Sequence, residues 1–165
     1  MPDLIIIEGA PGSGKSTVAA LLRNHLRSVD LDLGKLREFH LDRDWGNESA
    51  EDERVAFENM RLIIRNYIGN GFRNIIAHDL GDNRATQLAE EFDSMLVALT
   101  PDDDVLRQRI TSRNSGFTDV GRALSFNALV KARSLLANER RLDNSLLSPD
   151  QTMLAILGLL DKNAA

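Results

Sequence analysis

A loop with the spacing Gly-x-x-x-x-Gly-Lys-Ser begins at Gly9, directly after an apolar run that is typical of a buried strand. Glycines in such a loop allow backbone N–H groups to converge on phosphate oxygens, and the next helix directs its positive N-terminus at the same charge. Lys15 can then reach the β- and γ-phosphates, and the Ser16 hydroxyl can bind Mg²⁺. The sequence therefore predicts a site for a nucleoside triphosphate. The residues expected to hold it are Gly9, Gly12, Ser13, Gly14, Lys15, Ser16 and Thr17.

Acidic residues stand at the ends of two further predicted strands. The strand over residues 28–32 carries Asp30 and Asp32, and the strand over residues 74–79 ends in His78 and Asp79. In parallel α/β sheets, ligands bind at the carboxyl ends of the strands. We therefore expect functional acids here, with solvated turn residues as the alternative for Asp30 and Asp32 and a helix cap for Asp79. For His78 we expect packing or contact with a substrate.

Two arginines are spaced to act together. Arg109 and Arg113 are four apart in a helix predicted over residues 100–113, so they are expected to share one helix face. Two guanidinium groups on one face are suited to contact a phosphate or a base, with a solvated surface as the alternative. The helix leads into residues 114–120, a polar segment with one glycine that we predict to be a small mobile lid.

The composition excludes several classes of protein. A net charge of −5 argues against a nucleic-acid backbone as the main partner, because that partner needs a basic face. The absence of cysteine excludes disulfides and thiolate metal sites. No apolar run approaches the roughly 20 residues that span a bilayer, and we expect no signal peptide. These features favour a cytoplasmic protein with no membrane partner. The oligomeric state cannot be inferred from them.

Strand and helix patterns alternate along the chain, which predicts one domain over residues 1–165. Such alternation is typical of a three-layer α/β/α fold around a parallel sheet, here of five strands. A capping box is predicted at Ser49 and Asp52, and a second helix start at Ser148. The predicted strands are 4–8, 28–32, 74–79, 95–99 and 141–143; the predicted helices are 15–27, 49–70, 84–92, 100–113, 121–138 and 148–160.

Several uses of a phosphate loop are disfavoured. The chain has no Asn-Lys-x-Asp guanine motif of GTPases and no Leu-Ser-Gly-Gly signature of transporter ATPases. Asp79 is followed by Leu80, whereas motor and unfoldase ATPases place a water-polarising glutamate there. Transfer of the γ-phosphoryl group to a bound acceptor is the chemistry that remains.

Three sets of residues resemble one family over nearly the whole chain. These are the phosphate loop, the run Val29-Asp30-Leu31-Asp32, and the run Asp104 to Arg113, which is similar to the family's Leu-x-x-Arg-x-x-x-Arg pattern at a lid. The tail from Leu142 to Ser145 also resembles the family's adenine-side loop. The family comprises the small P-loop kinases, among them gluconate kinase, shikimate kinase, chloramphenicol phosphotransferase and the kinase domain of polynucleotide kinase.

The resemblance implies a phosphotransferase that uses ATP and Mg²⁺, with catalytic residues Lys15, Asp32, Arg109 and Arg113. It implies that Asp32 accepts the proton of an acceptor hydroxyl, that Ser16 and Asp79 hold Mg²⁺, and that Arg113 also contacts the nucleotide.

The acceptor is expected to be a small molecule such as a sugar acid or an antibiotic, with Asp30, Arg37 and His78 as candidate contacts. Arg43 and Trp45 are further candidates, and a surface helix or the core is the alternative for them and for Arg37. A nucleotide kinase, a 5′-hydroxyl polynucleotide kinase and a regulatory module that only binds ATP stay open.

Overall fold

The computed structural model describes residues 1–39, 49–81, 83–114 and 116–163. At its centre lies a five-stranded sheet with the order β2-β3-β1-β4-β5, in which every neighbouring pair is parallel. This confirms the predicted sheet. The strands are β1 (Leu4–Gly9), β2 (Asp30–Asp32), β3 (Ile75–His78), β4 (Ser94–Leu99) and β5 (Glu139–Leu142).

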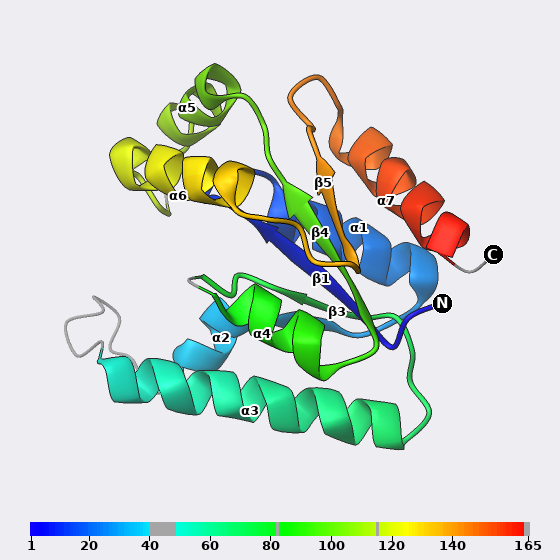
Figure 1. Cartoon of the computed structure of the whole chain (residues 1–165). Helices are drawn as coiled ribbons and strands as arrows, with labels where there is room; N and C mark the ends of the chain where they lie inside the picture. The colour runs from blue at the N-terminus through cyan, green and yellow to red at the C-terminus, as the bar shows by residue number, and fades with distance from the viewer. Residues whose placement is uncertain (40–48, 82, 115, 164–165) are drawn as a thin grey trace.

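Helices cover both faces of the sheet, which confirms the three-layer arrangement (Figure 1). One face packs against α1 and α7, and the other against α3 and α4, while α5 and α6 lie beyond the phosphate loop. The helices are α1 (Lys15–Leu26), α2 (Leu33–Arg37), α3 (Ala50–Gly69), α4 (Arg84–Glu91), α5 (Asp103–Thr111), α6 (Val120–Ala132) and α7 (Pro149–Asn163).

The central strand β1 is apolar on both faces because it is covered on both. Successive side chains of a strand point to opposite faces. Leu4 and Ile6 therefore join the core formed with α3 and α4, whereas Ile5 and Ile7 join the core formed with α1 and α7. All four are fully buried. The carboxyl end of β1, and the loop that follows it, are thereby fixed in the middle of the sheet.

Two predicted helix starts are confirmed by their capping bonds. The backbone N–H of Asp52 donates to Ser49 Oγ (3.1 Å) at the start of α3, and the N–H of Gln151 donates to Ser148 Oγ (3.2 Å) at the start of α7. These bonds satisfy N–H groups that have no partner within the helix.

Two predicted boundaries were wrong because of contacts with distant parts of the chain. We predicted that Thr100 caps α5 and that Pro101 begins it. Thr100 N–H instead donates to the carbonyl of Leu142 (3.0 Å), which prolongs the pairing of β4 with β5, and the helix begins at Asp103 after the N-cap residue Asp102. We predicted that α6 extends to residue 138, but it ends at Ala132, where Arg133 has an extended backbone.

Arg133 leaves the helix to pair with two buried acids. Its guanidinium contacts Glu8, in β1 immediately before the phosphate loop, and Glu139 at the start of β5. Burial raises the pKa of Glu8, and the charge of Arg133 acts in the opposite direction. A buried carboxylate is tolerated where a cation compensates it. The cluster of Glu8, Arg133 and Glu139 therefore fixes the end of α6 to the strand that carries the loop.

Within the described part of the chain, no helix is both long enough and apolar enough to cross a membrane.

Candidate active site

The phosphate loop occupies the turn between β1 and α1, and its backbone requires glycine. Gly12 has a φ of +91°, and a Cβ on it would lie 2.8 Å from Ile110 Cγ1 and 3.0 Å from Leu106 Cδ1. Any side chain there would be strained and would force the Ile110 and Leu106 side chains of α5 to shift. Glycine at this position therefore allows α5 to pack directly against the loop.

The N-terminus of α1 is free of any side-chain cap. Its N-cap residue is Gly14, no side-chain capping bond forms among the described residues, and the first turn contains no acid. The first N–H groups of a helix have no partner within the helix, and they carry partial positive charge. Ser16 and Thr17 are exposed in this turn. The residues present thus fit the phosphates of a nucleotide.

Lys15 is buried where the other charged residues of the site converge. Its Nζ donates to the carbonyl of Ala10 (3.1 Å) across the loop. Burial lowers the pKa of Lys15; the charges of Asp79 and Asp32 act to raise it, and that of Arg113 to lower it. The structure thus brings three predicted residues from three other segments into the electrostatic range of the Lys15 ammonium group.

Asp32 and Asp79 approach each other over Gly34. A Cβ built on Gly34 would lie 2.7 Å from Asp79 Oδ2 and 3.0 Å from Asp32 Oδ1, so both oxygens lie close to one point. Asp32 Oδ1 also accepts from the N–H of Gly34 (2.9 Å) and caps α2, a role that sequence analysis did not anticipate. Asp79 does not cap the next helix, whose N-cap is Asn83. Two carboxylate oxygens close to one point fit the oxygen ligands and bound waters that Mg²⁺ prefers.

The missing side chain of Gly34 gives a testable prediction. Alanine normally stabilises a helix relative to glycine by about 0.5–1 kcal/mol, but here the new methyl group displaces both carboxylates. We expect Gly34→Ala to remain folded, with an unfolding midpoint near that of the wild type, and to lose nucleotide-dependent activity by about tenfold through misplaced carboxylates. The control is Gly158→Ala, since a Cβ there meets nothing within 4 Å. Equal activity of the two variants would show that the carboxylate positions are unimportant.

Three predicted substrate contacts lie beside ionisable groups of the protein. His78 is buried, and its Nε2 lies 3.0 Å from Asp30 Oδ1, so these two residues of adjacent strands face each other. Arg37 forms ion pairs with Glu53 (2.9 Å) and with Asp79 (3.3 Å). Contact of any of the three with a substrate stays a prediction. Arg43 and Trp45 lie outside the described residues.

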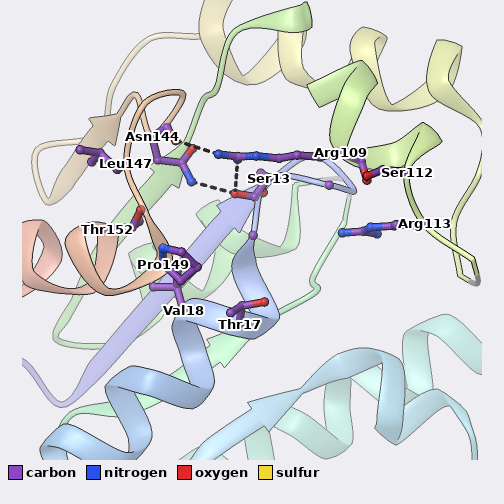
Figure 2. Close-up of a pocket in the computed structure, with 12 residues that line it drawn as sticks. Ser13, Thr17, Val18, Arg109, Ser112, Arg113, Asn144, Leu147, Pro149 and Thr152 are labelled. Atoms are coloured by element: carbon purple, nitrogen blue, oxygen red, sulfur yellow. Dashed lines mark hydrogen bonds between the residues drawn. The ribbon is translucent and has the colours of Figure 1, made fainter. Parts of the chain in front are cut away.

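Arg109 and Arg113 line the same cavity, of about 290 Å³, although not as one helix face. The helix α5 ends at Thr111, so Arg113 lies beyond it. Figure 2 shows Arg109 directed toward the phosphate loop, where it donates to the carbonyls of Asn144 (2.9 Å) and Ser13 (3.4 Å). Burial lowers the pKa of Arg109, and the charge of Asp143 opposes the effect. An arginine remains charged in proteins nevertheless.

The cavity extends from the phosphate loop to the start of α7. Asn144 is buried, and its side-chain amide donates to the carbonyl of Ser13 (2.9 Å), which ties the β5–α7 connection to the loop (Figure 2). Leu147, Pro149 and Thr152 complete this side. Apolar walls with a few fixed polar groups suit a flat heterocycle such as a nucleotide base. Asn144 was not among the predicted site residues, although the segment that contains it was associated with the base.

A phosphate loop between the central strand and the first helix of a parallel sheet places the chain in the P-loop NTPase superfamily. Within it, residues 5–121 match the model of the family described as an AAA domain, and the chain belongs to that family.

Solved structures with this fold include several small kinases. A sugar kinase from a Janibacter species is similar with a TM-score of 0.72 and 17% identity, over 98% of this chain and 95% of the other. A gluconokinase from Sinorhizobium meliloti has a TM-score of 0.71 and 16% identity, over 99% and 95%. Shikimate kinase from Aquifex aeolicus has a TM-score of 0.66 and 17% identity, over 98% of each chain. The chain therefore has the fold of the small P-loop kinases. No curated protein matches the sequence.

Proposed function

We propose that the protein is a phosphotransferase that moves the γ-phosphoryl group of ATP to a hydroxyl of a small molecule. The observation that carries the proposal is the approach of Asp32 and Asp79 over Gly34, within the electrostatic range of Lys15. In the sheet, β2 and β3 lie on one side of β1, whereas β4 and β5, which lead to the elements that line the cavity suited to a base, lie on the other. Transfer to an acceptor requires a donor site together with a group that can take the acceptor's proton.

Each residue has a proposed task in the transfer. Lys15 and the N–H groups of the loop stabilise the charge of the β- and γ-phosphates. Ser16 and Asp79 would hold Mg²⁺, which when bound neutralises charge on the phosphate oxygens. Asp32 takes the proton of the acceptor hydroxyl as its oxygen bonds to the γ-phosphorus, and the bond from that phosphorus to the ADP oxygen breaks. Arg113 adds positive charge at the transferring group, and Arg109 contacts the base or the phosphates.

Two further parts of the interpretation belong to the same proposal. One part is the lid, in the connection that joins α5 to α6 between Thr111 and Val120. This connection follows Arg109, and the far end of α6 is fixed by Arg133. Its action as a lid stays a prediction. A cytoplasmic location, where ATP is available, goes with the proposed activity.

A screen of acceptors tests the proposal directly. The purified protein is incubated with Mg²⁺·ATP and, separately, with sugars, sugar acids, aminoglycosides, other organic acids, nucleosides and nucleotides, and ADP release is compared with that in the absence of an acceptor. Acceptor-dependent ADP and a phosphorylated product seen by mass spectrometry would support a small-molecule kinase. Transfer confined to nucleosides, nucleotides or 5′-hydroxyl oligonucleotides would assign a nucleotide or polynucleotide kinase instead. Tight ATP binding with no transfer to any acceptor would favour a regulatory module.

A further inference from the structure

Glu53, in the first turn of α3, joins two arginines from neighbouring helices. Its Oε1 lies 2.9 Å from Arg37 Nη1, and its Oε2 lies 3.2 Å from Arg84 Nη2. Arg84, at the start of α4, also donates through Nη1 to the carbonyl of Leu80 (3.0 Å). All three ionic side chains are less than one-fifth exposed. A carboxylate that uses both oxygens in this way fixes the position of each guanidinium.

The same chain of ion pairs continues to the candidate active site. Arg37 uses its second terminal nitrogen, Nη2, to contact Asp79 Oδ2 at 3.3 Å. The Asp79 side chain is 44% exposed, and within the described residues Arg37 is the partner of its carboxylate. The backbone of Asp79 has a φ of +59°, a conformation that few residues other than glycine adopt. The rotamer of Asp79 therefore depends on where Arg37 is held.

We propose that Glu53 is a positioning residue that acts on the phosphate-transfer edge of the sheet through Arg37. Glu53 holds Nη1 of Arg37, and Nη2 in turn holds the Asp79 carboxylate beside Asp32. The inference rests on the proposed function only in assigning Mg²⁺·ATP as the ligand of that edge. It gives Arg37 an internal task in place of direct contact with an anionic acceptor.

The alternative is that Glu53 merely stabilises the packing of α2, α3 and α4. Loss of one partner from a buried ion pair is destabilising in either case, because a charge is left unpaired. The two roles differ in whether the effect of Glu53 requires the carboxylate of Asp79. A double-mutant cycle measures such a dependence directly.

The experiment uses Glu53→Gln, Asp79→Asn and the double variant of the full-length protein. Glutamine keeps the shape of the side chain and removes its charge. The readout is the ratio of the dissociation constants of ATP without and with Mg²⁺, measured by calorimetry, so no acceptor is needed. The control is Glu58→Gln. Glu58 is an acid of the same helix, and it pairs with Arg61 (2.9 Å). Thermal unfolding is measured for every variant.

Glu53→Gln is expected to reduce the Mg²⁺ enhancement of ATP binding by about tenfold, as is typical when a group that orients a metal ligand is lost. Asp79→Asn should reduce it at least as much, and adding Glu53→Gln to it should cause no further loss. Glu58→Gln should leave the ratio unchanged. An unchanged ratio in Glu53→Gln, or effects that simply multiply in the double variant, would overturn the proposal.

If Glu53→Gln fails to fold, Arg37→Lys replaces it in the same cycle. Lysine keeps one charge but lacks the fork that contacts Glu53 and Asp79 together, so it should show the same loss. Failure of the proposed function would look different. Mg²⁺ would still enhance ATP binding, and that enhancement would still depend on Glu53, but no acceptor would be phosphorylated.

Discussion

Lys15→Ala is expected to lower nucleotide turnover by about 100-fold to 1,000-fold, while the protein remains folded. Lys15 is buried, but the bond that its ammonium forms with the described residues is to the carbonyl of Ala10, and the other influences on it are charges around the loop. We therefore expect it to serve the ligand rather than the apolar core. Removing one such preorganised electrostatic contact typically costs that much in rate. Ser16→Ala should also abolish turnover, since it removes the hydroxyl that we propose to bind Mg²⁺. Turnover is measured as ADP released with the best acceptor from the screen.

Lys131→Ala serves as the matched control for Lys15→Ala. Lys131 is partly exposed on α6 and pairs with Asp103 at 3.5 Å, away from the phosphate loop. Its loss should leave turnover unchanged. Wild-type ADP production by a folded Lys15→Ala protein would refute the assignment of the loop.

Asp32→Asn is expected to reduce phosphate transfer by roughly 100-fold to 10,000-fold, the range associated with the loss of a general base. The substitution is informative because asparagine is also a good N-cap residue. Its side-chain oxygen can accept from the N–H of Gly34 as Asp32 Oδ1 does, so the start of α2 is preserved. ATP affinity should remain near that of the wild type. Equilibrium binding of ATP and single-turnover transfer are measured side by side.

The two measurements on Asp32→Asn separate three assignments. Loss of transfer with intact binding supports the proton acceptor. Loss of ATP binding alone would make Asp32 a metal-site or structural residue, and no change in either would transfer the role to Asp30 or Asp79. Asp104→Asn, an exposed acid in the first turn of α5, is the control and should behave as the wild type.

The sequence was sufficient wherever structure depends on neighbours along the chain. The phosphate loop, the two capping serines and the parallel sheet could be predicted because each depends on a local spacing or on a continuous apolar run. The end of α6 could not, since Arg133 leaves the helix to pair with acids in β1 and β5. The predicted association of Arg109 with Arg113 did hold at one cavity, but the end of α5 at Thr111, which places Arg113 outside the helix, was not foreseen.

The residues that sequence analysis missed also owe their roles to contacts between distant parts of the chain. The first turn of α3 contains Glu51, Asp52 and Glu53, and all three fit the preference for acids at a helix start. Nothing in the sequence distinguishes the one that faces Arg37 and Arg84. Gly34 was likewise invisible, because its importance lies in two carboxylates that approach from different strands. Asn144 donates to a residue 131 positions away.

The contacts of Ser13 and Glu8 determine when, during synthesis of the chain, the site is complete. The strand and loop that bind phosphates emerge first, but Arg133, the counterion of Glu8, follows 125 residues later, and Asn144 follows Ser13 by 131. A chain that ends earlier has no Arg133 to compensate Glu8 and no Asn144 to line the cavity beside the loop. We therefore expect ATP binding to require the finished chain: nascent or C-terminally truncated forms that end before β5 contain the whole phosphate-binding motif but lack Arg133 or Asn144, or both, beside it.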